Sequence, residues 1–207
     1  MRLVFASHNP DKIRELAHAL EGLPVEVVSA GEYPGSEPVE ENGETLEENA
    51  LLKARAVYQA TDELCVADDT GLEVDALGGE PGVHSARYAG PEQSYHKNLE
   101  KLLAEMKEVP AGSRAARFRT AVAIVFPDGS ELLLAGACEG EILSEPRGES
   151  GFGYDPVFYL PEKDKTFAEM TLAEKQALSH RGRAMRKARR MLAAYLEAPT
   201  AARPGSP

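Results

Sequence analysis

The 207-residue chain contains no tryptophan and only two cysteines, and no segment approaches the length of a transmembrane helix. Two cysteines in a chain of this length do not make a disulfide framework. Cys65 and Cys138 both lie in apolar runs, which is typical of small buried side chains. The start, MRLVFASHNP, has too short an apolar run for a signal peptide. We therefore expect a cytoplasmic protein with no membrane partner.

Positive charge is also scarce. The chain has 23 Lys and Arg against 34 Asp and Glu, which gives a net charge of −11. This balance argues against broad, salt-sensitive binding to nucleic acid or to an anionic membrane. A basic stretch from residue 181 onward could be a nucleic-acid patch, but the solvated face of a helix is the favoured alternative. A small anionic ligand stays possible if a metal ion or a lysine cluster offsets its charge.

The pattern of apolar residues predicts an α/β fold. With 43% hydrophobic residues, the chain suits one domain over residues 1–197, followed by a flexible tail over 198–207. Strands are predicted at 3–7, 25–29 and 64–67, with a hairpin formed by 118–126 and 131–138. Helices are predicted at about 10–20, 45–60, 94–107 and 181–196, with a short one capped by Thr171 and Glu174. Residues 31–44, 71–92 and 148–156 are rich in glycine and proline and indicate irregular structure. The sheet should be mixed.

The first candidate site is Ser7-His8-Asn9-Pro10-Asp11-Lys12. A strand ends here, and Asn9 and Pro10 are typical of a helix N-cap and first helical residue. Unpaired N–H groups of a first helical turn favour an anion, and Lys12 adds a positive charge. The segment could therefore bind phosphate. The alternative, favoured when the segment is taken alone, is an ordinary capped helix whose lysine faces water.

The second candidate site is Asp68-Asp69-Thr70-Gly71, with Glu40 and Glu41 upstream. Neighbouring carboxylates at the end of a strand repel one another unless a cation lies between them. Magnesium prefers a few carboxylates together with water and substrate phosphates. One carboxylate could hold the metal while the other takes a proton from water. The alternative is a polar turn that closes the strand.

The third candidate site combines Phe152-Gly153-Tyr154-Asp155-Pro156 with Lys175 and Ser179-His180-Arg181. Aromatic rings on a glycine-flanked loop can stack on a base. Lysine, histidine and arginine donate hydrogen bonds and aspartate accepts them, as the polar edge of a purine requires. The alternative is a turn packed on the core, followed by a charged helix start.

Six segments together resemble the inosine/xanthosine triphosphate pyrophosphatase family, whose members are also called Ham1-like or RdgB-like. They occur in the family's order and cover nearly the whole chain. The segments are SHNPDK at 7–12, ENGETLEENALLKA at 41–54, ADDTGLEVDALGG at 67–79, PGVHSARYAG at 81–90, GFGYDP at 151–156 and EKQALSHRG at 174–182.

The resemblance implies hydrolysis of ITP, dITP and XTP between the α and β phosphates, with magnesium as cofactor and manganese as a substitute. It also implies a two-lobed domain, a long mixed central sheet flanked by helices, an active-site cleft between the lobes, and a homodimer. Such an enzyme would remove non-standard purine nucleotides before they enter DNA or RNA.

The resemblance also implies a role for each matching residue. The triphosphate would be bound by Ser7, His8, Asn9, Pro10, Asp11, Lys12 and Lys53. Asp69 would accept a proton, and Thr70 beside it would contact the substrate. Metal ligands would come from Glu40, Asp69, Asp68 and Glu41, with Glu40 favoured over Glu41. The base pocket would comprise Phe152, Gly153, Tyr154, Asp155, Lys175, His180 and Arg181. Ser7 departs from the threonine that is common in the family, but it keeps the hydroxyl.

Two other functions compete with this prediction. The same chemistry could act on another modified nucleotide, such as a pyrimidine, because Phe152 and Tyr154 would stack on any base. A nucleotide-binding module without catalysis is the other alternative. A pure binder has no need to place Asp68 and Asp69 near phosphates, so the sequence argues against it.

Overall fold

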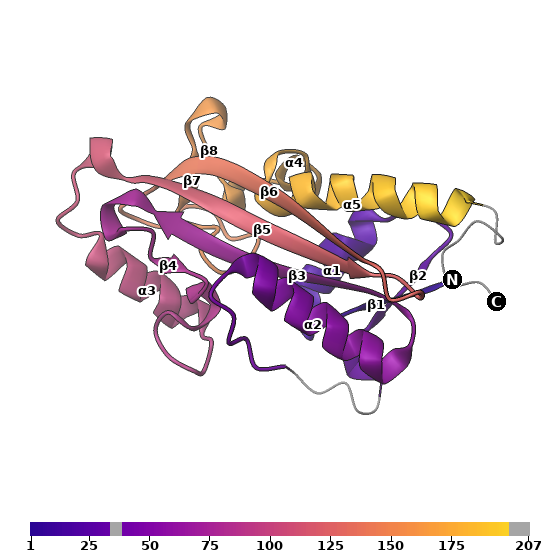
Figure 1. Cartoon of the computed structure of the whole chain (residues 1–207). Helices are drawn as coiled ribbons and strands as arrows, with labels where there is room; N and C mark the ends of the chain where they lie inside the picture. The colour runs from indigo at the N-terminus through magenta and orange to yellow at the C-terminus, as the bar shows by residue number, and fades with distance from the viewer. Residues whose placement is uncertain (34–38, 199–207) are drawn as a thin grey trace. The chain divides into compact units, whose positions relative to one another are not determined.

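The computed structural model describes residues 1–33 and 39–198, so part of the predicted 31–44 loop and nearly all of the predicted tail lie outside the described residues. Its strands are β1 Arg2–Phe5, β2 Glu26–Ser29, β3 Leu64–Val74, β4 Pro81–Gly82, β5 Ala115–Val125, β6 Glu131–Ile142, β7 Phe158–Leu160 and β8 Lys165–Thr166. Its α-helices are α1 Pro10–Ala19, α2 Leu46–Thr61, α3 Tyr95–Glu105, α4 Leu172–Leu178 and α5 His180–Glu197. Figure 1 shows these elements in chain order. None of the described helices is long and apolar enough to cross a membrane.

The predicted α/β fold with a mixed sheet is confirmed. The strand order is β2-β1-β3-β5-β6-β7-β8, with β4 paired to β3 off this path. β1 runs parallel to both β2 and β3, whereas β3 pairs with β4, β6 with β7 and β7 with β8 in antiparallel fashion. The predicted hairpin is present as β5 and β6, which are adjacent in the sheet and joined by a turn at 126–130.

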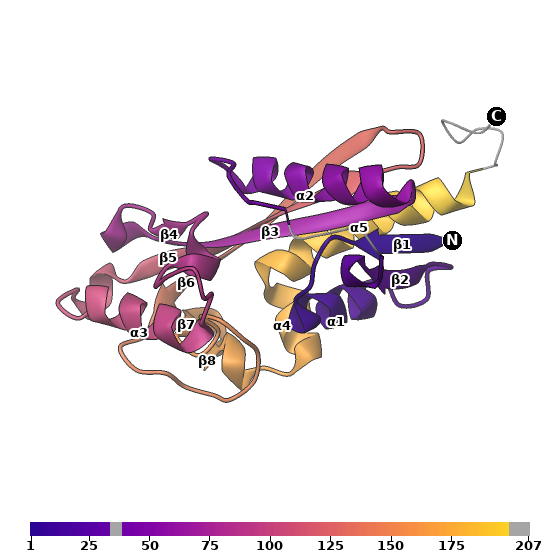
Figure 2. The same cartoon turned by 90° about the horizontal axis from the view of Figure 1, so that it is seen from below.

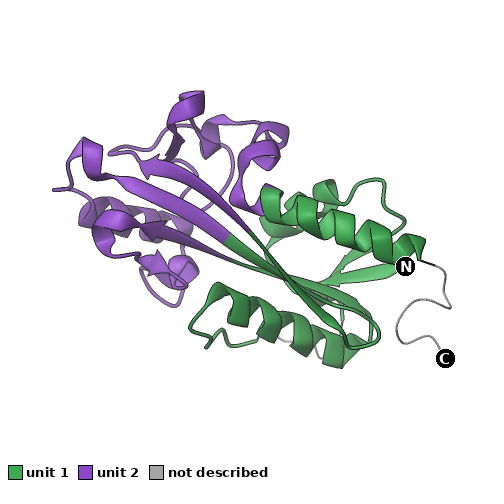
Figure 3. Ribbon diagram, turned by 45° about the horizontal axis from the view of Figure 1, so that its top comes forward, with its two compact units in different colours: residues 1–69, 120–135, 183–207 green, residues 70–119, 136–182 purple. Residues whose placement is uncertain are grey.

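The chain divides into two compact units, coloured separately in Figure 3. Unit 1 comprises residues 1–69, 120–135 and 183–207. Its core lies where α1 and α5 pack on β1, β3 and β5, through buried residues such as Phe5, Leu16 and Met185. The other face of these strands is covered by α2, as Figures 1 and 2 both show. The strands of unit 1 are therefore covered by helices on both faces, which explains why residues 64–67 form a continuous apolar run.

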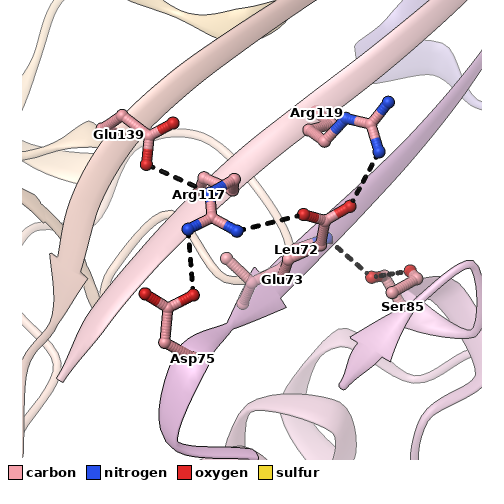
Figure 4. Close-up of polar contacts among 8 residues, drawn as sticks. Leu72, Glu73, Asp75, Ser85, Arg117, Arg119 and Glu139 are labelled. Carbon is pink, nitrogen blue, oxygen red and sulfur yellow. Dashed lines mark hydrogen bonds and ion pairs between the residues drawn. The ribbon is translucent and has the colours of Figure 1, made fainter. Parts of the chain in front are cut away.

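Unit 2 comprises residues 70–119 and 136–182. Its core is more aromatic, with Phe118, Phe158 and Phe167 packed on one another and Leu102 and Met106 added at the end of α3. One sheet face of this unit carries a charged cluster instead of a helix-covered surface. Arg117 ion-pairs there with Glu73, Asp75 and Glu139, as Figure 4 shows. These side chains are partly or largely exposed, so we expect each pair to contribute little to stability.

The prediction that a strand ends at residue 67 was wrong. β3 continues through Asp68, Asp69, Thr70 and Gly71 to Val74, so the acidic pair lies inside a strand and not in a turn. The strand continues because Leu72 and Val74 are fully buried in the core of unit 2, with the less buried Glu73 between them. This alternation of two apolar residues with one charged residue is the ordinary signal of a strand with one buried face.

Candidate functional site

The helix that follows β1 begins as the sequence predicts. Asn9 caps α1, and its Oδ1 accepts hydrogen bonds from the N–H groups of Asp11 (2.9 Å) and Lys12 (3.4 Å). The carboxamide therefore already contacts two of the N–H groups that could receive an anion. Lys12 does not face water, because its Nζ lies 3.2 Å from Asp68 Oδ1 and its side chain is only 19% exposed. The lysine is thus held at the acidic pair.

The two neighbouring aspartates of β3 contact different lysines. Successive side chains of a strand point to opposite faces of the sheet. Asp68 pairs with Lys12 of α1, and Asp69 Oδ1 accepts a hydrogen bond from Lys53 Nζ of α2 at 2.9 Å. The strand geometry therefore separates these carboxylates, and each is compensated by its own lysine. The two aspartates therefore do not share one lysine between them.

Lys53 also binds the upstream acidic segment. Its Nζ donates to Glu41 Oε1 at 2.7 Å, so one ammonium group bridges Glu41 and Asp69. Glu40, which the sequence analysis favoured, is exposed, and its carbonyl oxygen accepts a hydrogen bond from Asn42 N. The structure thus places Glu41, and not Glu40, at Lys53.

Asn49 holds this acidic segment in place, a role that the sequence analysis missed. Asn49 is fully buried on α2, and its Oδ1 accepts a hydrogen bond from Gly43 N at 2.8 Å. A Cβ atom at position 43 would lie 2.7 Å from that oxygen, so the approach requires glycine. The spacing of Gly43 and Asn49 within the matching segment was visible, but nothing local indicated that they touch.

Burial and charge act in opposite directions on Asp69. Burial raises the pKa of its carboxyl group, the positive charge of Lys53 lowers it, and the net shift is upward. Burial lowers the pKa of Lys53, but Asp69, Glu41 and Asp68 outweigh this effect and the net shift is again upward. A carboxylate with a raised pKa binds a proton more readily, which suits a general base. The remaining oxygen, Asp69 Oδ2, is buried without a hydrogen-bond donor among the described residues.

The same residues bear on metal binding. No group of three or more His, Cys, Asp or Glu side chains in the described part of the chain is arranged to hold a metal ion. Zinc sites usually need three or four protein ligands, whereas magnesium uses one or two carboxylates together with water and substrate phosphates. Asp69 and Glu41 offer two carboxylates around one ammonium group, and Asp69 Oδ2 has no donor. This oxygen-only donor set fits magnesium.

In unit 2, the predicted base-pocket residues Phe152, Asp155, Lys175 and Arg181 lie together. Lys175 Nζ donates to Asp155 Oδ2 at 2.7 Å, and both side chains are buried. The same oxygen accepts a hydrogen bond from Phe152 N at 2.9 Å, and the Phe152 ring lies under the charges of Lys175 and Arg181. Arg181 also donates to Thr70 Oγ1 at 3.1 Å. These contacts hold an aromatic ring beside two buried cationic donors.

The loop before Phe152 depends on glycine. Gly151 has φ +77°, and a Cβ atom there would collide with the Asp155 carboxylate. Only glycine combines this backbone conformation with so close an approach. The glycine-flanked pattern of this segment therefore serves the Asp155 contact. Gly153 also has a positive φ of +63°, with open space around it.

Two predicted pocket residues lie in the core of unit 2. The His180 ring is 3% exposed and stacks on Phe118, with ring centroids 4.4 Å apart. The Tyr154 ring belongs to the same core, and its hydroxyl donates to Ser85 O at 2.8 Å. Neither ring is placed as an exposed stacking surface. Tyr95 of α3, which the sequence analysis did not select, contacts Phe152 instead, with ring centroids 5.7 Å apart.

Two basic residues of α5 contact backbone carbonyls of the protein itself. Lys187 donates to the carbonyl of Ala135, and Arg189 donates to the carbonyls of Ala19 and Glu21. These contacts all lie within unit 1. Arg183, Arg186 and Arg190 of the same helix are exposed, which fits the alternative of a solvated helix face.

Comparisons with known proteins show which family the chain resembles. The model of the Ham1 family matches residues 3–191. A protein of Desulforamulus reducens called dITP/XTP pyrophosphatase is 50% identical over 192 residues, which are 93% of this chain and 96% of that protein. One of Bacillus subtilis with the same name is 47% identical, over 92% of this chain and 96% of that protein.

Solved structures of similar fold include Ham1 proteins as well. The Ham1 protein of Staphylococcus aureus has a TM-score of 0.83 at 39% identity, covering 94% of this chain and 99% of that one. A HAM1 protein from Coxiella burnetii also has a TM-score of 0.83, at 37% identity and with the same coverage. With a family model that spans nearly the whole chain and relatives of this identity, the chain belongs to the Ham1 family.

Proposed function

We propose that this protein is an enzyme that hydrolyses non-standard purine nucleoside triphosphates, namely ITP, dITP and XTP, to a nucleoside monophosphate and pyrophosphate. Its full-length relatives named dITP/XTP pyrophosphatase support this assignment. The observation that carries the chemistry is Asp69: a buried carboxylate with one oxygen on Lys53 and the other without a donor among the described residues. Such a group can take a proton from water.

The proposed chemistry on unit 1 is hydrolysis between the α and β phosphates. Asp69 accepts a proton from water as the water oxygen bonds to the α-phosphorus, and the bond from the α-phosphorus to the departing pyrophosphate breaks. Lys12 and Lys53 are the cations available to stabilise charge on the pyrophosphate. Both lysines are pre-positioned by carboxylates, Lys12 by Asp68 and Lys53 by Glu41 and Asp69.

We further propose magnesium as the cofactor, with Asp69 and Glu41 as its protein ligands. When bound, magnesium would neutralise negative charge on the phosphates. Lys53 contacts both of these carboxylates, so the same cluster would hold a cation and a lysine beside the triphosphate. Manganese has the same preference for oxygen ligands and should substitute.

Base selection is proposed for unit 2. Hypoxanthine and xanthine carry a 6-keto oxygen that accepts hydrogen bonds, whereas adenine carries a 6-amino group that donates them. Lys175 and Arg181 are buried donors beside the Phe152 ring. The 6-amino donor of adenine would face the donors of Lys175 and Arg181. A buried mismatch of that kind can lower kcat/KM by about 10⁴-fold or more.

One assay tests the substrate and the metal together. We expect pyrophosphate release from ITP, dITP and XTP with magnesium at rates that exceed those from ATP by about 10⁴-fold in kcat/KM. Chelation by EDTA should abolish this activity, and manganese should restore it. Equal rates on ITP and ATP would disprove the base selection. Tight ITP binding without hydrolysis in either metal would instead identify a binding module.

Replacing Arg181 tests the base-edge argument. Arg181→Ala removes the donor that contacts both Thr70 and Phe152, so we expect the preference for ITP over ATP to fall by about 10- to 100-fold. Arg190→Ala, on the exposed face of the same helix, is the matched control and should keep the preference. Retention of the full preference in Arg181→Ala would show that Arg181 does not read the base edge.

We also propose that residues 1–197 act as one catalytic domain, and that the enzyme is a cytoplasmic homodimer. The family resemblance supports both statements. Light scattering of the purified full chain would measure the oligomeric state, and a monomer at working concentration would exclude the dimer.

A further inference from the structure

The segment PGVHSARYAG, residues 81–90, matches the family but has no role in the chemistry above. Ser85 lies at its centre, in the 3-10 helix Ser85–Arg87, and is only 6% exposed. Its Oγ accepts a hydrogen bond from Leu72 N at 2.8 Å and donates to Gly82 O at 2.6 Å. Figure 4 shows the bond to Leu72, two residues beyond Thr70. Ser85 is therefore attached to β3 just after the acidic motif.

The carbonyl oxygen of Ser85 joins two other parts of unit 2. It accepts hydrogen bonds from Tyr154 Oη at 2.8 Å and from Asn98 Nδ2 at 3.4 Å. Asn98 is buried on α3 and also binds Ala86 O and Ala89 N. Every polar atom of the Asn98 side chain is thus used to attach α3 to this segment. We call Ser85, Asn98 and Tyr154 the Ser85 network.

Tyr154 connects this network to the base-recognition loop. It lies between Phe152 and Asp155 in the sequence, and Phe152 N donates to Asp155 Oδ2 across it. Its ring is in the core and its hydroxyl is attached to a residue 69 positions away. The same helix that carries Asn98 places Tyr95 against the Phe152 ring. The Tyr154 hydroxyl and the Tyr95 ring contact therefore help to set the position of Phe152 and Asp155 relative to α3 and β3.

We propose that Tyr154 is a positioning residue for base recognition, which acts through its hydroxyl bond to Ser85 and not by stacking on the base. This inference rests on the proposed function and refines it. The sequence predicts that Tyr154 stacks on the base, whereas here it holds the loop that carries the stacking ring of Phe152. Loss of the hydroxyl lets the 151–156 loop shift against α3. Phe152 and Asp155 then bind the base less well, while Asp69, on unit 1, keeps its surroundings.

The test is Tyr154→Phe, which removes the hydroxyl and keeps the ring in the core. Ser85 O retains its longer bond from Asn98, so the variant should fold. We expect KM for ITP to rise by about 5- to 10-fold, with kcat within about 2-fold of the wild type. The dissociation constant of inosine monophosphate, measured by calorimetry, should rise by the same factor. Tyr159→Phe is the matched control, because it removes another tyrosine hydroxyl bond of unit 2, the exposed one to Asp164.

A second variant approaches the network from the other side. Ser85→Ala keeps the carbonyl group that Tyr154 binds but removes the Oγ bonds to Leu72 and Gly82. Ser85→Ala should also raise KM for ITP. If both variants lower the melting temperature but leave KM and the dissociation constant unchanged, Tyr154 only packs the core and the proposal is wrong. A fall in kcat with unchanged KM would overturn it equally. Failure of the proposed function is separate, because the wild type would then show no preference for ITP over ATP.

Discussion

Replacing Asp69 with asparagine is expected to lower the rate of pyrophosphate release from ITP by about 10²- to 10⁴-fold, the usual contribution of a general base. Asparagine has nearly the same shape but accepts a proton poorly. It also carries no charge to bury, and burial is the main reason for the raised pKa of Asp69. The folded state should therefore keep its melting temperature or gain slightly. Steady-state pyrophosphate release and thermal unfolding measure the two effects.

The control for this variant is Asp75→Asn. Asp75 follows β3 directly, six residues after Asp69, but its side chain is half exposed and pairs with Arg117 on the surface. We expect wild-type turnover from it. If Asp69→Asn turned over ITP at the wild-type rate, Asp69 would not be the proton acceptor, and the assignment of the acidic motif would have to change.

Replacing Arg114 with alanine is expected to give the largest loss of stability. Arg114 is 8% exposed and donates to four backbone carbonyls, those of Ile142, Met106, Val109 and Leu143, over 2.6–3.2 Å. Met106 is the C-cap of α3, where a cation is also favoured by the helix dipole. Removal of the guanidinium leaves several buried acceptors without this donor, at a cost of about 3–5 kcal/mol in the free energy of unfolding.

Urea denaturation measures this change, and Arg117→Ala is its matched control. Arg117 lies on β5, three residues after Arg114, and makes ion pairs on an exposed face (Figure 4). Exposed ion pairs of this kind contribute about 1 kcal/mol or less to the free energy of unfolding. Equal losses in the two variants would show that the four carbonyl bonds of Arg114 add nothing beyond an ordinary surface arginine. Arg114→Lys should lie between them, because a single ammonium group cannot reach all four carbonyls.

The local elements of the fold could be predicted because their causes are local. Asn9 with Pro10 and Thr171 with Glu174 each act over one helical turn, and both predicted helix starts are confirmed. The helix predicted from about residue 45 is also confirmed, and the structure shows a Thr45–Glu48 capping box at its start. The tight turn between β5 and β6 likewise depends on a few adjacent residues. The sequence pattern predicts too early an end for β3, because acidic residues are unusual within a strand. Its full length follows from the burial of Leu72 and Val74 in a different unit from Val66.

The candidate site shows the same division. The sequence alone indicates the chemical types of the site residues: two lysines, a carboxylate pair, and an aromatic loop with cationic donors. Only the tertiary structure assigned Lys12 to Asp68 and Lys53 to Asp69, brought Glu41 instead of Glu40 to Lys53, and turned Tyr154 into the core toward Ser85. Pairs such as Tyr154 and Ser85, or Lys53 and Asp69, are many residues apart, and no local pattern states which of several polar neighbours will meet. Burial decides this, because a polar group removed from water must lie where a partner from another segment can reach it.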